Sequence, residues 1–337
     1  MSLTGREHSH PTLAELAADA KRPLAMPIAV FPGLALTGGT VRQAVTKPEA
    51  QVAASRALHE RYQTRVVLSA MDLSVEAEAF GCQLVVSEDE IPTVTGSLVT
   101  ELEQAKKLRV PKPGEGRSWV YLETVKGLCA LPTHPLVLAG CIGPFSLAAR
   151  LVGVSEAMML TVSDPELMHV LVNKSAEFLA AYVRVFQAAG AGGVVMAEPA
   201  AGLLSPKSLA EFSSAYVRRI VEEAGESFSV ILHNCAAKLV HLPAILQSGA
   251  RTFHFGAPMD IAGALRQTKE EITICGNLDP TAVFVQGTPD EVAERTTARL
   301  AEVGSSQRFI ISSGCDIPAR APLKNLDAFF RAAGNEP

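Results

Sequence analysis

Residues 230–235 read Val-Ile-Leu-His-Asn-Cys, a short apolar run that ends in two metal-binding side chains. His233 and Cys235 are two positions apart, so at the end of an extended strand their side chains point to the same side. One imidazole and one thiolate make up half of a zinc site, and the remaining ligands must come from another part of the chain.

A second segment has the same form. Residues 310–316 read IISSGCD, an apolar run followed by small residues and then Cys315. Strand ends that deliver ligands to one point are typical of the C-terminal mouth of a parallel barrel. We therefore expect His233, Cys235 and Cys315 to hold one metal ion and to leave a fourth position open. The alternative is that both cysteines are ordinary core residues, because free cysteine is often buried.

Outward from these two segments, short apolar runs alternate with helical segments along the chain. This alternation indicates parallel strands joined by crossover helices, and eight strands indicate a closed (β/α)8 TIM barrel. An open doubly wound sheet is the rival, but the first strand is not followed by G-x-G-x-x-G. The eight expected strands are 25–31, 65–69, 136–139, 193–196, 230–233, 252–255, 273–276 and 309–312. Expected helices include 48–62, 164–188, 205–223 and 239–248.

Two segments fall outside this repeating pattern. Residues 1–22 are expected to form an N-terminal extension with a helix over 12–20, for which Thr12 is a good N-cap. Residues from about 75 to 117 are expected to form a rim insertion with a β-hairpin around an acidic turn. With no strong internal boundary, residues 1–337 are predicted to be a single barrel domain.

Composition narrows the classes of function. The chain has 337 residues, a net charge of −5 and no basic run, which gives no support for binding nucleic acid or an anionic membrane. Residues 1–10 are polar, and no apolar run reaches the ~18 residues that span a bilayer. Six cysteines in so long a chain do not indicate a disulfide framework. We expect a soluble cytoplasmic protein in which Cys82, Cys129, Cys141 and Cys275 are packing residues.

Other polar residues close further strands. Glu198 is a candidate fourth ligand or base near the metal, or else a rim carboxylate paired with an arginine. His254 and Asp279 are candidate catalytic residues, with a core histidine and a helix cap as the alternatives. Asp72 and Asn277 are candidates for substrate binding, and the alternative for Asp72 is a rim salt bridge.

The combination of motifs resembles the uroporphyrinogen decarboxylase superfamily and, within it, the cobalamin-dependent methyltransferase branch. The resemblance runs from about residue 24 to residue 333. The His-x-Cys motif with a distant Gly-Cys is its specific part, since it is the zinc set of that branch. The supporting segments are 70–74 (AMDLS), 76–81 (EAEAFG), 90–94 (EIPTV), 143–145 (GPF), 198–199 (EP), 204–206 (LSP), 233–235 (HNC), 276–280 (GNLDP) and 313–318 (SGCDIP).

This resemblance implies a (β/α)8 barrel in which His233, Cys235 and Cys315 bind zinc. It implies a small thiol acceptor, such as coenzyme M, and a methyl donor of the methylcobalamin type carried on a partner corrinoid protein. A free thiol with a pKa of ~8.5 is mostly protonated at neutral pH, and zinc coordination deprotonates it. Members of the superfamily are often dimers, so a homodimer is one expected state.

The chain also departs from the decarboxylase branch. That branch has an arginine-rich segment after its first strand, whereas residues 31–36 here read FPGLAL. A tetrapyrrole decarboxylase and a non-catalytic corrinoid-binding protein remain the alternatives. The acceptor is also open and includes a non-thiol such as a folate. The sulfonate of coenzyme M would favour a nearby cation, for which Arg251, Arg320 and Lys238 are candidates by position.

Overall fold

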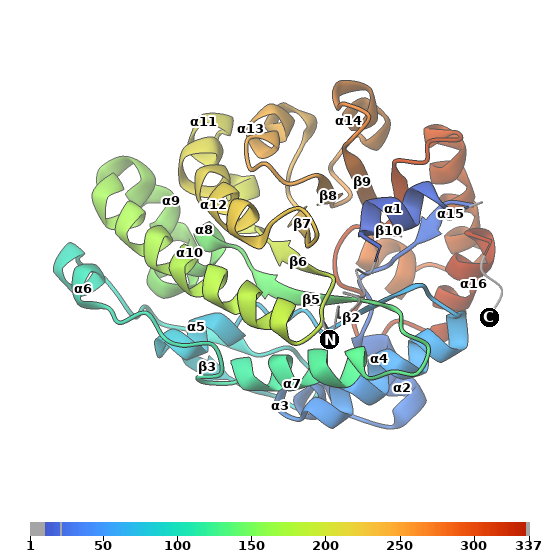
Figure 1. Cartoon of the computed structure of the whole chain (residues 1–337), viewed down its shortest axis with the longest axis horizontal. Helices are drawn as coiled ribbons and strands as arrows, with labels where there is room; N and C mark the ends of the chain where they lie inside the picture. The colour runs from blue at the N-terminus through green and yellow to red at the C-terminus, as the bar shows by residue number, and fades with distance from the viewer. Residues whose placement is uncertain (1–10, 21, 335–337) are drawn as a thin grey trace, which may run out of the picture.

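Eight parallel strands curl around a common axis, with helices outside them, in this computed structural model (Figure 1). The structure describes residues 11–20 and 22–334. Within this sheet, each strand from β2 onward pairs with the sheet's next strand in chain order, so that β2 pairs with β5, and β10 pairs with β1. The strands are β1 (Leu24–Ala25), β2 (Val66–Leu68), β5 (Leu136–Ile142), β6 (Gly193–Ala197), β7 (Ser229–Asn234), β8 (Thr252–Phe255), β9 (Thr273–Leu278) and β10 (Phe309–Ser313). This order confirms the predicted TIM-barrel-type fold. Within the described residues, β1 and β2 share no ladder.

The first strand is shorter than expected. Instead of covering 25–31, β1 ends at Ala25, and residues 31–33 form the short helix η1 (Phe31–Gly33). The ladder to β10 ends because the next N–H that faces β10, that of Ile28, bonds a side-chain hydroxyl instead of a backbone carbonyl. The chain still follows β10, because the Met26 N–H donates to the Ile311 carbonyl at 2.9 Å and the Ile28 N–H donates to Ser313 Oγ at 3.0 Å.

The helices form the outer layer of the molecule. Most agree with expectation, but the single helix expected over 205–223 is interrupted by a π-helical turn, η3 (Ala210–Ser214), and five of the outer helices lie where none was predicted, namely α2, α3, α8, α9 and α14. The outer helices are α2 (Leu34–Thr37), α3 (Val41–Thr46), α4 (Pro48–Tyr62), α7 (Ser118–Cys129), α8 (Pro144–Val152), α9 (Val154–Ser163), α10 (Pro165–Ala188), α11 (Pro206–Leu209), α12 (Ala215–Ala224), α13 (Leu242–Leu246, preceded by η4, Leu239–His241), α14 (Ile261–Gln267), α15 (Pro289–Val303) and α16 (Leu323–Ala332).

The two segments outside the repeat have the expected form. Helix α1 (Leu13–Ala18) begins at Thr12 with a capping box, and residues 1–10 and 21 of the expected extension lie outside the described residues. The rim insertion contains α5 (Val75–Phe80), the antiparallel hairpin of β3 (Gln83–Val85) and β4 (Thr93–Thr95), and α6 (Leu102–Lys107). The predicted hairpin is therefore confirmed.

The parallel sheet gives the molecule two distinct ends. All strands point the same way, so residues that follow strands gather at one end, the mouth, and residues that precede strands gather at the other. Arg251 directly precedes β8 and pairs with Glu226 at 3.0 Å. It therefore lies at the end opposite His233, and its prediction as a cation beside the site was wrong.

No single helix in the described part of the chain is long and apolar enough to cross a membrane. Helices α8 and α9 have the required length and composition only when taken together, and the two are bent by 103°. Eight of the nine residues of α8 are buried inside the protein.

Candidate metal centre

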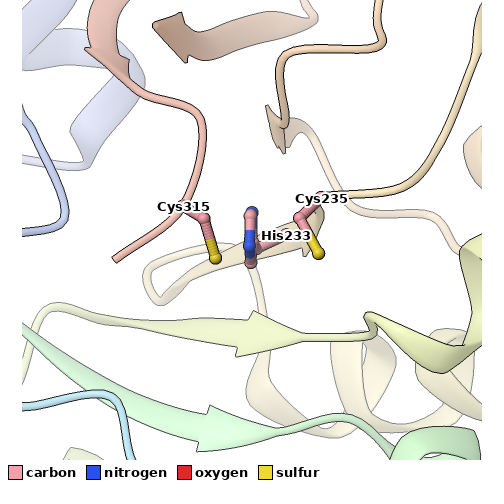
Figure 2. A group of neighbouring side chains, drawn as sticks. All are labelled: His233, Cys235 and Cys315. Atoms are coloured by element: carbon pink, nitrogen blue, oxygen red, sulfur yellow. The ribbon is translucent and has the colours of Figure 1, made fainter. Parts of the chain in front are cut away.

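Three potential metal ligands converge at the mouth of the barrel. One ligand atom each from His233, Cys235 and Cys315 lies within 4.8 Å of the others, and Figure 2 shows the three side chains meeting from two separate segments. His233 belongs to β7, while Cys315 follows β10, so two further strands stand between them. In a flat sheet that offset would be about 14 Å, at roughly 4.8 Å per strand. Curvature of the sheet therefore creates the cluster.

Two glycines allow the two cysteine loops to approach each other. Gly256 follows β8, and a Cβ atom at that position would collide with the backbone of Cys235. A Cβ atom on Gly314 would lie 2.9 Å from the backbone nitrogen of Ala257. The loop after β8 is thus packed between the two cysteine segments, and its lack of side-chain bulk sets their separation.

The two thiols lie within 4.8 Å of each other and influence each other's protonation. The neighbouring Cys315 thiol lowers the pKa of Cys235 to about 7, while the Cys235 thiol together with burial raises the pKa of Cys315 to about 12. One thiolate therefore forms readily and the second proton is held tightly. A cation that replaces this proton would be bound by both sulfur atoms.

The ring of His233 contacts a second histidine, His254. Its Nδ1 atom lies 2.8 Å from Nδ1 of His254 and 3.3 Å from the His254 carbonyl oxygen. His254 Nε2 lies 2.8 Å from Ser312 Oγ, and the Ser312 hydroxyl donates to the Met26 carbonyl at 2.6 Å. Burial, and then the neighbouring His233, lower the pKa of His254 well below its usual range. His254 contacts a ligand but does not belong to the ligand cluster.

The Glu198 carboxylate is hydrogen-bonded at the start of helix α8 and lies outside the cluster of His233, Cys235 and Cys315. Its carboxylate accepts hydrogen bonds from the N–H groups of Phe145 and Ser146, at 2.9 and 2.8 Å, and from the Ser213 hydroxyl at 3.0 Å. Burial raises the pKa of Glu198, and these donors oppose the rise. The carboxylate thus caps the start of α8 rather than pairing with an arginine, and it lies outside the ligand cluster.

The two candidates after β9 have clear structural contacts. Asp279 Oδ1 accepts from the N–H groups of Thr281 and Ala282, both at 2.8 Å, and so begins the π-helix η5 (Pro280–Val285). Asn277 Nδ2 donates to the carbonyls of Gly256 and Met259, at 3.0 and 2.8 Å. Asn277 therefore fixes the backbone of the loop after β8, which is the loop that lies between the two cysteine segments. Catalysis by Asp279 and substrate binding by Asn277 remain predictions.

Asp72 is tied to the rim insertion. It is 4% exposed, and its carboxylate accepts from Arg117 at 2.6 Å, from the Ser74 hydroxyl at 2.6 Å and from the Tyr121 hydroxyl at 3.2 Å. Its carboxylate lies outside the ligand cluster. These contacts agree with the alternative that Asp72 forms a salt bridge at the rim. Binding of substrate by Asp72 remains a prediction.

Several residues that shape the centre were not identified from the sequence. The small residues before Cys315 were visible in the segment IISSGCD, but nothing indicated that Ser312 contacts a histidine two strands away. Gly256 follows an apolar strand, as many glycines do, and only the folded backbone shows what it contacts. The other two cation candidates, Lys238 and Arg320, follow β7 and β10 and are exposed.

Comparison with known proteins agrees with this architecture. The family model described as uroporphyrinogen decarboxylase (URO-D) matches residues 28–335. A methylated-thiol–coenzyme M methyltransferase of Methanosarcina mazei is 31% identical over 276 residues, covering 79% of this chain and 71% of that protein. A methylcobamide:CoM methyltransferase, MtbA, of Methanosarcina acetivorans is 29% identical and covers 78% of each chain. A uroporphyrinogen decarboxylase of a Synechococcus species is 28% identical, covering 86% of this chain and 84% of that protein.

The chain therefore belongs to the uroporphyrinogen decarboxylase family, and its curated relatives include methylcobamide:CoM methyltransferases. The resemblance inferred from the motifs is confirmed. Among solved structures, a methyltransferase from Methanosarcina mazei superimposes with a TM-score of 0.85, covering 95% of this chain and 97% of that chain at 22% identity. This structural similarity independently confirms the fold.

Proposed function

We propose that this protein is a zinc-dependent methyltransferase that moves a methyl group from a methylated corrinoid to a small thiol. The observation that carries the proposal is the cluster of His233, Cys235 and Cys315 at the barrel mouth. Its support from comparison is the similarity to proteins named methylcobamide:CoM methyltransferases. By the same analogy, the corrinoid would arrive on a partner protein.

The donor set fits zinc. In a tetrahedral zinc site the ligand bonds are about 2.0–2.3 Å long, so the ligand atoms lie roughly 3.5–3.8 Å apart. The three donor atoms here lie within 4.8 Å of one another, which requires only small side-chain adjustments. Two sulfur ligands and one imidazole favour zinc over magnesium or calcium, which prefer oxygen. Three protein ligands also leave one position free for a substrate.

Zinc at this position would lower the pKa of the acceptor thiol, so that the acceptor reacts as a thiolate at neutral pH. The chain's own part is to hold the acceptor sulfur at the mouth, where a large flat donor can approach from outside. The sulfur electron pair forms a bond to the methyl carbon, and the cobalt–carbon bond breaks with its electron pair left on cobalt, giving cobalt(I). The proton of the thiol is released when the acceptor binds.

We propose coenzyme M or a similar small anionic thiol as the acceptor. The relatives named for coenzyme M support this choice. Because Arg251 lies at the opposite end of the barrel, Lys238 and Arg320 are the remaining candidates to attract its sulfonate. Both follow strands that carry the cluster and are exposed at the same end.

Metal analysis combined with a transfer assay tests the proposal. Purified wild type is expected to contain about one zinc per chain and to methylate coenzyme M from methylcobalamin. Cys315→Ala should lose both properties. Cys275→Ala is the matched control, since Cys275 is fully buried in β9 and lies outside the cluster. Full activity in a zinc-free wild-type preparation would exclude the proposal.

Tetrapyrrole decarboxylation is the second candidate, because the same family includes uroporphyrinogen decarboxylases at similar identity. It predicts release of carbon dioxide from uroporphyrinogen, with Cys315→Ala as active as wild type. A corrinoid-binding protein without catalysis would instead retain methylcobalamin and transfer nothing. The transfer assay and a carbon dioxide assay on the same preparation separate the three functions.

A further inference from the structure

We propose that Ser312 and His254 form a buried hydrogen-bond relay that fixes the tautomer of His233 and leaves its Nε2 atom free for the metal. Both are positioning residues, since neither belongs to the ligand cluster. The importance of the relay for metal binding rests on the proposed zinc site. The tautomer itself does not, because it is a property of the metal-free protein.

The relay begins at a backbone carbonyl. Ser312 Oγ lies 2.6 Å from the carbonyl oxygen of Met26, and the Ser312 side chain is fully buried. A carbonyl can only accept a hydrogen bond, so the single hydroxyl proton of Ser312 must point at Met26. The lone pairs of Ser312 Oγ then face the remaining neighbour, His254.

The second step sets the proton on His254. Its Nε2 atom lies 2.8 Å from Ser312 Oγ, which has no second proton to give, so Nε2 must be the donor. His254 is 0% exposed, and its ring contacts are another imidazole and a hydroxyl rather than an anion. A charged imidazole would be uncompensated there. The neutral ring has one N–H, so Nδ1 of His254 carries a lone pair.

The third step sets the proton on His233. Its Nδ1 atom faces two acceptors, the Nδ1 lone pair of His254 at 2.8 Å and the His254 carbonyl at 3.3 Å. Nδ1 of His233 must therefore carry the proton. The other nitrogen, Nε2, keeps its lone pair, and a lone pair is what a metal ligand requires.

The relay also fixes the orientation of the ring. The two imidazoles meet edge to face, with centroids 4.7 Å apart and planes at 74°. Metal-binding histidines usually donate their second N–H to a fixed acceptor, which holds both ring and tautomer. Here the acceptor chain crosses the barrel from β7 to β8 and β10 and ends at Met26, which follows β1. A ligand on one strand thus depends on three others.

The test compares three variants of the full chain. His254→Asn keeps an acceptor close to the position of Nδ1, His254→Leu removes it, and Ser312→Ala removes the group that orients His254. Two-bond proton–nitrogen NMR of metal-free protein labelled in histidine reports the tautomer, with the His233 signals assigned by their loss in His233→Asn. Zinc affinity is measured by competition with a chelator.

Wild type should show His233 protonated at Nδ1 only. His254→Leu should give a mixture of tautomers and bind zinc about 10–100-fold more weakly, as expected for loss of such a partner. His254→Asn should stay within about 3-fold of wild type, and Ser312→Ala should lie between them. If His254→Leu fails to fold, Ser312→Ala and Ser312→Thr, which restores the hydroxyl, make the same comparison.

Three results overturn the relay: His233 protonated at Nε2 in wild type, equal zinc affinity in wild type and His254→Leu, or equal losses in the Leu and Asn variants. Failure of the proposed function looks different. In that case wild type binds no zinc, while the NMR experiment still reports the tautomer of His233 in the metal-free chain.

Discussion

Two buried polar clusters lie at the mouth end of the barrel, and they differ in whether their polar atoms already have hydrogen-bond or ion-pair partners. In the cluster of Asp72 and Arg117, the carboxylate and the guanidinium meet each other and are surrounded by further partners, Glu78, Ser74 and Tyr121. In the cluster of His233, Cys235 and Cys315, three potential ligand atoms converge within 4.8 Å of one another. The first cluster uses its polar atoms to hold the rim insertion, and the second has atoms available for an ion.

The comparison shows why strand-end position alone does not identify a site. Asp72, Glu198 and Asp279 all close strands at the mouth, as His233 does, and all three were candidates for that reason. The structure gives each carboxylate a set of fixed donors. A buried polar group with its hydrogen bonds satisfied is a stabilising feature first, and any role in chemistry must be shown by experiment.

The largest effect is expected from breaking the satisfied cluster. Arg117→Ala leaves Asp72 buried without its charge partner, which should cost about 3–5 kcal/mol of unfolding free energy. Urea denaturation measures this loss. The control is Arg42→Ala, which breaks an exposed pair with Glu88 and should cost less than about 1 kcal/mol. Folded Arg117→Ala should still bind about one zinc, and loss of zinc would show that the two clusters are not independent.

A pH-dependent effect should come from Glu76, beside the first cluster. Glu76 is 1% exposed, one carboxylate oxygen accepts from Ile142 at 3.1 Å, and the other has no partner among the described residues. Burial raises its pKa to about 8 from an ordinary 4.5. The folded state then holds the proton more tightly than the unfolded state, so stability falls as pH rises from about 4.5 to about 8.

Glu76→Gln removes this titration while keeping the acceptor for Ile142. Relative to wild type, the variant should gain on the order of 2–4 kcal/mol between about pH 5 and pH 8. Urea unfolding at the two pH values measures the difference. Glu103→Gln, at a side chain that is 69% exposed, should show no such change. A constant difference between wild type and Glu76→Gln would contradict the assigned pKa.

The second cluster can be tested through its spacing. Gly256→Ala places a methyl group against the Cys235 backbone and should move that thiol away from Cys315. Zinc affinity is expected to fall about 10–100-fold, as for other changes to the support of a metal site. Gly225→Ala is the control, since it strains a residue with φ of +77° and touches nothing nearby. Its zinc affinity should equal that of wild type, whatever its stability.

The smallest effect should come from Asp279→Ala. Loss of the cap of η5 is expected to cost about 1 kcal/mol of unfolding free energy, with zinc content and methyl transfer close to wild type. Thermal denaturation and the transfer assay together decide the role of this residue. A large drop in transfer at normal zinc content would instead support the catalytic role predicted from the sequence.

Much of the fold could be predicted because local patterns dominate there. Apolar runs of four to seven residues between helices predicted all eight barrel strands, and Thr12 as an N-cap predicted the first helix. Errors occurred where local chemistry is ambiguous. The first strand ends at Ala25 although the apolar run continues, and α8 is a nine-residue segment with eight buried residues, which a short apolar run does not distinguish from a buried strand.

The candidate site divides in the same way. The residue types and spacing of His233, Cys235 and Cys315 indicate a metal, because few other arrangements place two thiols and an imidazole at strand ends. Sequence alone gives no count of hydrogen-bond partners, so it could not separate these residues from Asp72 or Glu198. The sequence also could not show at which end of the barrel Arg251 lies. A residue just before a strand lies at one end and a residue just after it lies at the other, and the strand boundaries were not known to that precision.

The sequence by itself determined most of the strand and helix pattern, the family and the three candidate ligand residues, because each depends on residue type and short-range spacing. Only the tertiary structure decided the rest. Curvature of the sheet brings Cys315 to His233 across two intervening strands, glycine backbones set the gap between the cysteines, and a carbonyl after β1 orients the proton on Ser312. These are contacts between residues up to 286 positions apart, and they exist only once the strands are packed around a common axis.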